Sequence, residues 1–198
     1  PGSGPRYMSG PETVAAVVLA AGGGTRWDGD GHKLLAPLGG RPLAAHAFDA
    51  AAAAGLDELV VVVGAVDLVA AGVVPDGATV LANGRWADGQ AGSLCMAVEH
   101  ARSQGHAAVV VGLADSPGVP SEAWRAVAAA PSPLAVATFA GRRRPPTRIG
   151  RNLWDDLPTE GDQGARGLLS GRPDLVREVP CPGDPADVDV LEDLRRWS

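Results

Sequence analysis

A glycine-rich segment with two cations stands out as the part of this sequence that could do chemistry. Glycines without side chains let backbone N–H groups approach an anion closely, and Arg and Lys add the positive charge that a polyphosphate attracts. We interpret the segment as a cradle for a nucleoside triphosphate; the competing interpretation is a flexible loop with two surface cations. The residues concerned are Leu19, Ala20, Ala21, Gly22, Gly23, Gly24, Thr25 and Arg26, followed by Lys33.

Two better-known phosphate-binding loops do not match this segment. A P-loop needs GxxxxGK followed by Ser or Thr, and the chain has no such string. The dinucleotide fingerprint GxGxxG would begin at Gly22 and Gly24, but its third glycine position holds Trp27. Neither an ATPase motor nor a nicotinamide-dependent enzyme is therefore favoured.

Carboxylates that could bind a metal ion occur at two places. Asp115 closely follows an apolar run, and Asp187 and Asp189 are spaced so that they point to the same side of an extended chain. Mg²⁺ prefers one or two carboxylates together with substrate phosphates and waters. The alternatives are an Asx-type turn before Pro117 for Asp115, and a cap of the last helix for the later pair.

A second anion site is indicated where a helix is expected to begin. Gly89 and Gln90 could present backbone amides there, and Ser93 a hydroxyl. Taken alone, the segment more often indicates an ordinary turn from a loop into a helix. The basic run 142–144 could attract an anionic acceptor or form a solvated face.

The remaining pattern predicts the elements that position these residues. Valine-rich apolar runs alternate with alanine-rich helical segments, which is typical of βαβ units and of a parallel sheet covered on both faces. We expect an α/β fold, a single Rossmann-like three-layer α/β/α domain with a mostly parallel sheet. Strands are expected at 13–20, 58–63, 79–81, 107–113 and 134–139, and helices at 42–54, 91–104, 121–129 with Ser121 as N-cap, and 191–197.

Ligands of such open sheets bind at the carboxyl ends of the strands, where the glycine segment and Asp115 would lie. From Gly141 onward the order is expected to loosen, because Pro145 and Pro146 break regular structure. Two short helices are expected in this part of the chain.

Composition excludes several classes of protein. The 198 residues are 45% apolar and 20% charged, as in a globular domain, and the net charge of −6 argues against general nucleic-acid binding. Two cysteines without a CxxC motif exclude a disulfide scaffold and fit a reducing cytoplasm. No apolar run is long enough to span a membrane. We interpret 1–8 as a disordered leader or expression remnant, with Met8 the native start, and 9–198 as one domain.

The glycine segment and its continuation KLLAPLGGRPL, residues 33–43, resemble the signature of MobA-like nucleotidyltransferases. Within that family, the chain is similar to the molybdenum cofactor cytidylyltransferases, the MocA-like branch. The resemblance runs from about residue 14 to residue 197 and implies the fold of the nucleotide-diphospho-sugar transferases. The branch-like segments are 83–97, 112–120, 161–169 and 187–194.

The resemblance implies that a nucleoside monophosphate moves from an NTP, expected to be CTP, to an anionic phosphate acceptor with release of pyrophosphate. The acceptor implied is molybdopterin or the molybdenum cofactor, with a molybdoenzyme as a further partner. Mg²⁺ or Mn²⁺ would bind Asp115 and Asp189, with Asp187 as the alternative ligand. Arg26 and Lys33 would stabilise pyrophosphate, and the segments 19–25 and 89–93 would form the nucleotide or acceptor pocket.

Two departures from the branch leave other functions open. The chain has Arg144-Pro145-Pro146-Thr147 where the branch has a polar residue at position 145, and Ser116 where the branch has Gln or Met. The alternatives are a sugar- or alditol-phosphate nucleotidyltransferase and a non-catalytic, cofactor-binding chaperone.

Overall fold

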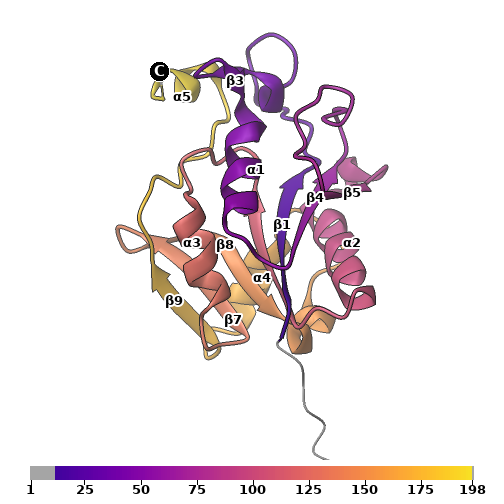
Figure 1. The fold of residues 1–198 in the computed structure, drawn as a ribbon, viewed down its shortest axis with the longest axis vertical. Coiled ribbons are helices and arrows are strands. Elements are labelled where there is room, and N and C mark those ends of the chain that lie inside the picture. Colours follow the sequence, from indigo (N-terminus) through magenta and orange to yellow (C-terminus); the bar gives the residue numbers. More distant parts are fainter. Residues whose placement is uncertain (1–11, 198) are drawn as a thin grey trace, which may run out of the picture.

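A seven-stranded sheet runs through the middle of the computed structural model, which describes residues 12–197 (Figure 1). Its strand order is β5-β4-β1-β6-β8-β7-β9, and only β8 runs antiparallel to its neighbours. The predicted mostly parallel sheet is therefore confirmed. The predicted leader, residues 1–8, lies outside the described part of the chain. The strands are β1 (Val14–Ala20), β4 (Glu58–Val63), β5 (Thr79–Ala82), β6 (Ala108–Leu113), β7 (Leu134–Phe139), β8 (Arg142–Gly150) and β9 (Val176–Pro180).

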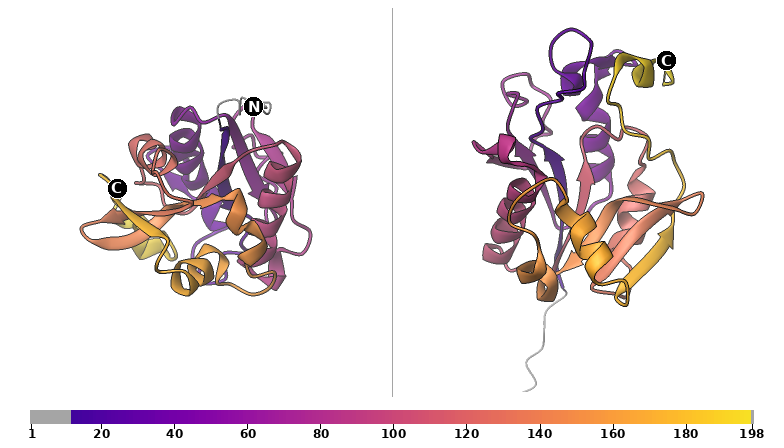
Figure 2. Two further views of the ribbon diagram at one scale, coloured as in Figure 1. Left: turned by 90° about the horizontal axis from the view of Figure 1, so that it is seen from below. Right: turned by 180° about the vertical axis from the view of Figure 1, so that it is seen from behind.

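Helices cover both faces of the sheet, as the valine-rich strands predicted (Figures 1 and 2). Alternate residues of β1 enter two separate cores: Val18 packs in the cluster with Phe48, and Val17 in the cluster with Leu94. This division makes three layers. One face is covered by α1 (Leu43–Ala53) and α3 (Ser121–Ala128), and the other by α2 (Gln90–Ser103), the 3₁₀ helix η3 (Arg151–Asp156) and α4 (Gly164–Gly171).

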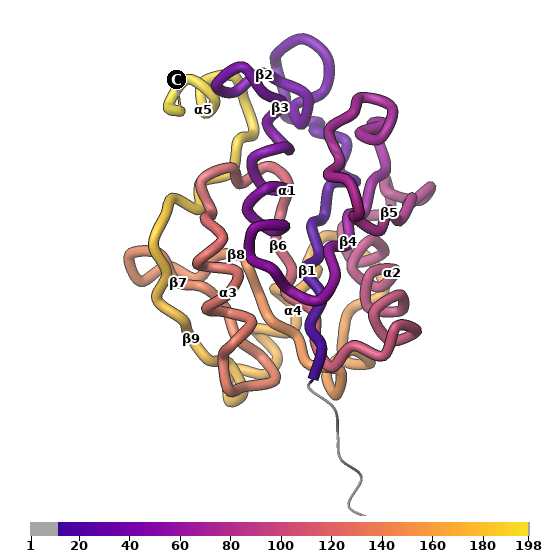
Figure 3. The backbone as a smooth tube through the Cα atoms, in the orientation of Figure 1, coloured from indigo at the N-terminus to yellow at the C-terminus, as the bar shows by residue number. Residues whose placement is uncertain are grey.

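A small third core lies beyond the carboxyl edge of the sheet. It joins the end of the chain to the segment after the glycine loop, and it contains Leu38, Leu43, Val188 and Leu194. The elements around it are η1 (Lys33–Leu35), β2 (Pro37–Leu38), β3 (Arg41–Pro42) and α5 (Leu191–Arg195). Figure 3 shows α5 beside β2 and β3. None of the helices in residues 12–197 is long and apolar enough to cross a membrane.

The register of the sheet brings three strand ends to one edge. Leu19 of β1 pairs with Leu113 of β6, and Ala20 pairs with Val63 of β4. The loops that follow these strands therefore emerge side by side. Because β8 is antiparallel to β6, it is the beginning of β8 that lies at this same edge.

The expectation of loose order after Gly141 was wrong. β8 is a nine-residue strand inside the sheet, and it contains both prolines. Thr147 pairs with Val136 and Arg144 with Ala137, so that Pro145 and Pro146 fall in a shift of register where no ladder pairing is required. Proline lacks the N–H that a ladder needs, and an irregularity of this kind accommodates it.

Two smaller sequence predictions also need correction. β9 was missed, because its residues are mostly exposed or half-buried and show no continuous apolar run. Ser121 is not the N-cap of α3: Pro120 occupies that position in an extended conformation, and its carbonyl accepts the first bond from Ala123.

A carboxylate network closes the opposite edge of the sheet. Glu58 begins β4 and accepts hydrogen bonds from Thr79 Oγ1 at 2.7 Å, His100 Nε2 at 2.8 Å and His106 Nε2 at 2.7 Å. Burial raises the pKa of Glu58, but these hydrogen bonds outweigh burial and hold the pKa below its usual value. The network joins β4, β5, α2 and the segment before β6.

Replacing this carboxylate by an amide should make stability less dependent on pH. We expect Glu58→Gln to lower the free energy of unfolding by about 1–3 kcal/mol at pH 7, because buried donors lose an acceptor. The contribution of the ionised Glu58 to the free energy of unfolding is present above its usual pKa of 4.5. This contribution is lost as the pH falls through the lower pKa that Glu58 has in the folded protein. Urea unfolding at pH 7 and at pH 4 measures both effects, with the exposed Glu122→Gln as control. If the free energies of unfolding of Glu58→Gln and wild type differ by the same amount at pH 7 and at pH 4, the ionised form of Glu58 does not stabilise the fold.

Candidate active site

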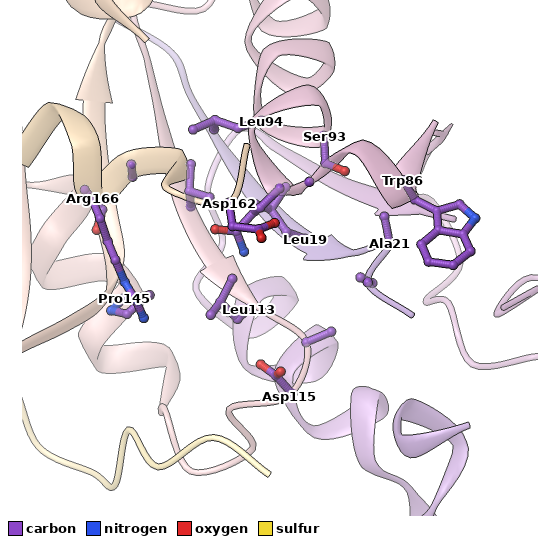
Figure 4. A pocket seen from close by; sticks show the side chains of 18 of the residues that line it. Leu19, Ala21, Trp86, Ser93, Leu94, Leu113, Asp115, Pro145, Asp162 and Arg166 are labelled. Carbon is purple, nitrogen blue, oxygen red and sulfur yellow. The ribbon is translucent and has the colours of Figure 1, made fainter. Parts of the chain in front are cut away.

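A cleft of about 830 Å³ opens at the carboxyl edge of the sheet (Figure 4). It is lined by the loop after β1, the start of α2, the end of β6, the start of β8 and the start of α4. Of the residues that the sequence singled out, it brings together Leu19, Ala20, Ala21, Gly22, Gly23, Gly24, Thr25, Lys33, Gly89, Gln90, Ser93 and Asp115. Arg26, Asp187 and Asp189 are not part of this lining: Arg26 and Asp189 are connected to it through Lys33, and Asp187 contacts Ser116, the residue after Asp115.

Lys33 lies between two carboxylates at the floor of the cleft. Its Nζ is 2.6 Å from Asp115 Oδ2 and 3.1 Å from Asp189 Oδ1, and its side chain is only 10% exposed. Burial lowers the pKa of Lys33, but the neighbouring Asp115 and Asp189 outweigh burial, so that the pKa is raised and the amine stays charged. Arg26 Nη1 lies 2.8 Å from the other oxygen of Asp189. Two cations and two carboxylates thus form one network.

Asp115 retains one carboxylate oxygen that nothing in residues 12–197 contacts by a hydrogen bond. This atom, Oδ1, is buried. Carboxylate oxygens are the hard donors that Mg²⁺ and Mn²⁺ prefer, so the residues present fit a divalent cation. No three carboxylate, imidazole or thiolate side chains of the described residues converge on one point. A metal ion here would therefore need phosphate oxygens or waters to complete its coordination.

The segment that carries Asp187 and Asp189 is held against the loop after β6. The N–H of Val188 donates to the carbonyl of Asp115, and Asp187 accepts a hydrogen bond of 2.7 Å from Ser116 Oγ. Burial raises the pKa of Asp187, and the charges of Asp115 and Asp189 raise it further against the opposing hydrogen bond of Ser116. Asp187 is therefore near enough to Asp115 and Asp189 for their charges to act on it, although the three side chains do not converge on one point.

A different carboxylate caps the last helix. Asp193 accepts the backbone N–H groups of Asp189 and Val190 at 2.9 and 3.1 Å. Capping of α5 therefore does not account for the side chains of Asp187 and Asp189.

The glycine loop is held by two side chains. The ring of Trp86 covers Gly23, where a Cβ would come within 2.6 Å of the ring. His32 accepts the N–H of Leu34 on Nδ1, which places its proton on Nε2, from which it donates to the carbonyl of Gly22 at 3.0 Å. Burial is the largest cause of a lowered pKa at His32, and the charge of Lys33 adds to it. The imidazole is therefore a neutral tether of the loop.

At the start of α2, Ser93 has a buried hydrogen-bond partner. Ser93 is buried, and its hydroxyl accepts a hydrogen bond of 2.9 Å from Asn83 Nδ2, a buried residue that sequence reasoning missed. Gly89 has a φ of 113°, in the region that favours glycine, and the N–H of Ala91 donates to the carbonyl of Gly161. The hydroxyl of Ser93 thus accepts one hydrogen bond and keeps its own O–H as a donor, so the anion site at the start of α2 stays a prediction.

Comparison with known proteins decides the family. The model of the MobA-like NTP transferase domain matches residues 16–177. The chain belongs to this family. It is a nucleotidyltransferase of the MobA-like type, and the family resemblance inferred from the sequence is confirmed.

Relatives of this MobA-like protein match it over nearly the whole chain. Nicotine blue oxidoreductase of Paenarthrobacter nicotinovorans is 30% identical over 197 residues, 92% of this chain and 95% of the relative. The crystal structure of Rv0371c from Mycobacterium tuberculosis H37Rv has a TM-score of 0.81 and 28% identity, covering 94% of this chain and 97% of that one. A structure of Rv0371c from the same organism in complex with manganese has a TM-score of 0.78 and 26% identity, and the match covers 93% of this chain and 97% of that one.

The far side of the cleft in this MobA-like protein is lined by Arg144 and Thr147 of β8 and by Asp162 and Arg166 at the start of α4. The sequence had indicated the basic run 142–144 as a possible site for an anionic acceptor, and Arg144 does line the cleft. Asp162 and Arg166 were covered by the resemblance, but nothing local in the sequence showed that they face the glycine loop. Two tryptophans lie near the glycine loop. Trp86 lines the cleft, whereas Trp27 packs over Gly29 against the small third core.

Removing the imidazole tether should loosen the glycine loop of this MobA-like protein. In His32→Ala, the backbone amides of Trp27 and Leu34 should exchange hydrogen faster, because Leu34 loses its acceptor and the carbonyl of Gly22 loses its donor. Hydrogen exchange followed by mass spectrometry measures this. His46→Ala is the matched control, since His46 bonds to the carbonyl of Leu38, beyond the loop. Unchanged exchange in segment 22–34 would show that His32 does not hold the loop.

Proposed function

We propose that this protein transfers cytidine monophosphate from CTP to the phosphate of molybdopterin or the molybdenum cofactor, with release of pyrophosphate. The observation that carries the proposal is the network of Lys33 and Arg26 with Asp115 and Asp189 beside a glycine loop. The cleft of about 830 Å³ is in the range of sites for small ligands and has room for more than a single phosphate group.

A divalent metal ion fits the carboxylates of this site. Mg²⁺ or Mn²⁺ would be held by Asp115 and Asp189, with Asp187 as the alternative ligand, and when bound it supplies positive charge to phosphate oxygens. The free oxygen of Asp115 and the manganese complex of Rv0371c support this part of the proposal.

The cationic side chains are assigned to the triphosphate. Lys33 and Arg26 would bind its β- and γ-phosphates and neutralise the charge that grows on the leaving pyrophosphate. The backbone N–H groups of Gly22–Gly24 would bind phosphate oxygens, and the segments 19–21 and 89–93 would hold the nucleoside. An oxygen of the acceptor phosphate bonds to the α-phosphorus as the bond from that phosphorus to the bridging oxygen breaks. Positioning and charge neutralisation supply most of the catalysis in such a step.

The choice of CTP, of molybdopterin and of a receiving molybdoenzyme comes from the resemblance to the MocA-like branch. The full-length relative named as an oxidoreductase means that the family alone does not fix the reaction. The deciding experiment is pyrophosphate release with Mg²⁺, purified molybdopterin and each of CTP, GTP, ATP and UTP. Turnover with CTP supports the proposal. Turnover only with a sugar or alditol phosphate, or binding without turnover, would replace it by the corresponding alternative.

Replacement of the central lysine should impair catalysis strongly. We expect Lys33→Ala to reduce kcat/KM for CTP by roughly 10²–10³-fold, the usual effect of removing a group that stabilises transition-state charge. Arg41→Ala is the control, because Arg41 forms an exposed ion pair with Asp49 outside the cleft. Circular dichroism checks that the variant folds without its buried cation. Activity equal to wild type would remove Lys33 from the reaction.

Removal of the carboxylates should weaken metal binding in a definite order. We expect Asp115→Asn and Asp189→Asn to weaken Mn²⁺ affinity at least about tenfold in the presence of CTP, because each loses a charged ligand. Asp187→Asn should weaken it less, since Asp187 is engaged by Ser116. Electron paramagnetic resonance of free Mn²⁺ measures this, with the exposed Asp155→Asn as control. A larger loss in the Asp187 variant would make that residue the second ligand.

A further inference from the structure

The cleft carries a second pair of cations on the side away from the glycine loop. Arg144 at the start of β8 and Arg166 in the first turn of α4 both line it. In Figure 4, Arg166 and Pro145 lie opposite Trp86 and Ala21, the side chain of Arg166 extends towards Pro145, and Asp115 lies between the two sides. Pro145 directly follows Arg144, so both arginines belong to the same wall.

These two arginines lack acidic partners within residues 12–197. Arg143, next to them, pairs with Glu178 at 2.7 Å. The guanidinium of Arg144 donates only to the carbonyl of Arg143, at 3.4 Å, and the side chain of Arg166 makes no hydrogen bond or ion pair with the described residues. Two exposed guanidinium groups on one wall of a cleft raise the local concentration of anions and can bind one by paired N–H donors.

Packing between α4 and α2 fixes the position of Arg166. A Cβ on Gly89 would come within 2.5 Å of the carbonyl of Gly161, and a Cβ on Gly164 within 2.7 Å of Gln90 Oε1. The N–H of Ala91 donates to the same carbonyl of Gly161 at 3.0 Å. The segment that leads into α4 and its first turn are therefore held against the start of α2, and this packing places the backbone of Arg166 beside the cleft.

The position of Arg144 relates this wall to the carboxylates. Its positive charge favours the ionised form of Asp187 and so opposes the burial that raises the pKa of that group. The strand itself offers little to an anion here, because Pro145 and Pro146 have no backbone N–H to donate. Recognition of an anion on this wall therefore depends on the guanidinium groups.

We propose that Arg144 and Arg166 bind the attacking phosphate of the acceptor, a phosphate monoester dianion. This inference rests on the proposed function and names the contacts of its second substrate. The two unpaired charges match the two charges of such a group, and they hold it opposite the triphosphate cations Lys33 and Arg26. A phosphate oxygen forms the new bond to the α-phosphorus, pyrophosphate departs with the electron pair of the broken bond, and a dianion needs no general base.

The test uses phenyl phosphate as the probe and benzoate as the comparison anion of single charge. Both are titrated by calorimetry into protein preloaded with Mg²⁺ and the non-hydrolysable analogue α,β-methylene-CTP, so that the triphosphate cations are occupied. We expect Arg144→Ala and Arg166→Ala each to weaken phenyl phosphate binding roughly tenfold to a hundredfold, as for a charged hydrogen-bonded pair. Benzoate should bind more weakly than phenyl phosphate to wild type.

Arg177→Ala is the matched control, because Arg177 is an exposed arginine of β9 that does not line the cleft. It should leave phenyl phosphate affinity unchanged, and all three variants should keep the affinity for the CTP analogue. Arg166→Lys keeps the charge but loses the paired donors. Its affinity for phenyl phosphate should therefore lie between those of wild type and Arg166→Ala. In turnover, the arginine variants should raise KM for the acceptor and leave KM for CTP unchanged.

The outcomes separate this inference from the proposed function. If the analogue binds but phenyl phosphate binds equally to wild type and to both variants, or not at all, the arginine site is wrong and the function stands. If benzoate binds as tightly as phenyl phosphate, the dianion is the wrong class of ligand. If the analogue does not bind while phenyl phosphate still depends on both arginines, the proposed nucleotide reaction fails and the anion site is retained.

Discussion

The ion pairs of Lys33 with Asp115 and Asp189 are the interaction on which the arrangement of the site depends. The two carboxylates lie 82 and 156 residues from the lysine in the sequence, and they would repel one another without the ammonium group between them. One amine thus connects the segment after the glycine loop, the loop after β6 and the end of the chain. The N–H bond from Val188 to Asp115 and the small apolar core around Val188 support the same junction.

A single antiparallel strand gives the cleft its two different walls. The parallel strands β1, β4 and β6 direct their loops to one edge, and these loops carry the glycines, Lys33 and Asp115. Because β8 enters the sheet in the opposite direction, its first residues reach that edge too, and α4 follows on the same side. The wall built by parallel strands holds main-chain donors and carboxylates, whereas the wall built by β8 and α4 holds the guanidinium groups of Arg144 and Arg166 together with Asp162.

Sequence reasoning identified the elements whose residues are buried on both faces. β1, β4, β6 and β7 have continuous apolar runs, and Asp115 was found because it follows such a run. β8 and β9 were missed because arginines, prolines and half-exposed side chains dilute the pattern that marks a strand. Arg166 and the network of Glu58 with His100 and His106 depend on contacts between distant segments, which neither spacing nor composition reveals.

The contact of Gly89 with Gly161 also limits how the two sides of the cleft are spaced. Gly89 precedes α2, while Gly161 belongs to the loop that leads into α4 and Arg166, and any side chain at position 89 would collide with that loop. A side chain at position 89 would force the segment around Gly161 away from the start of α2. The spacing between the two sides of the cleft is therefore set by one residue that has no side chain.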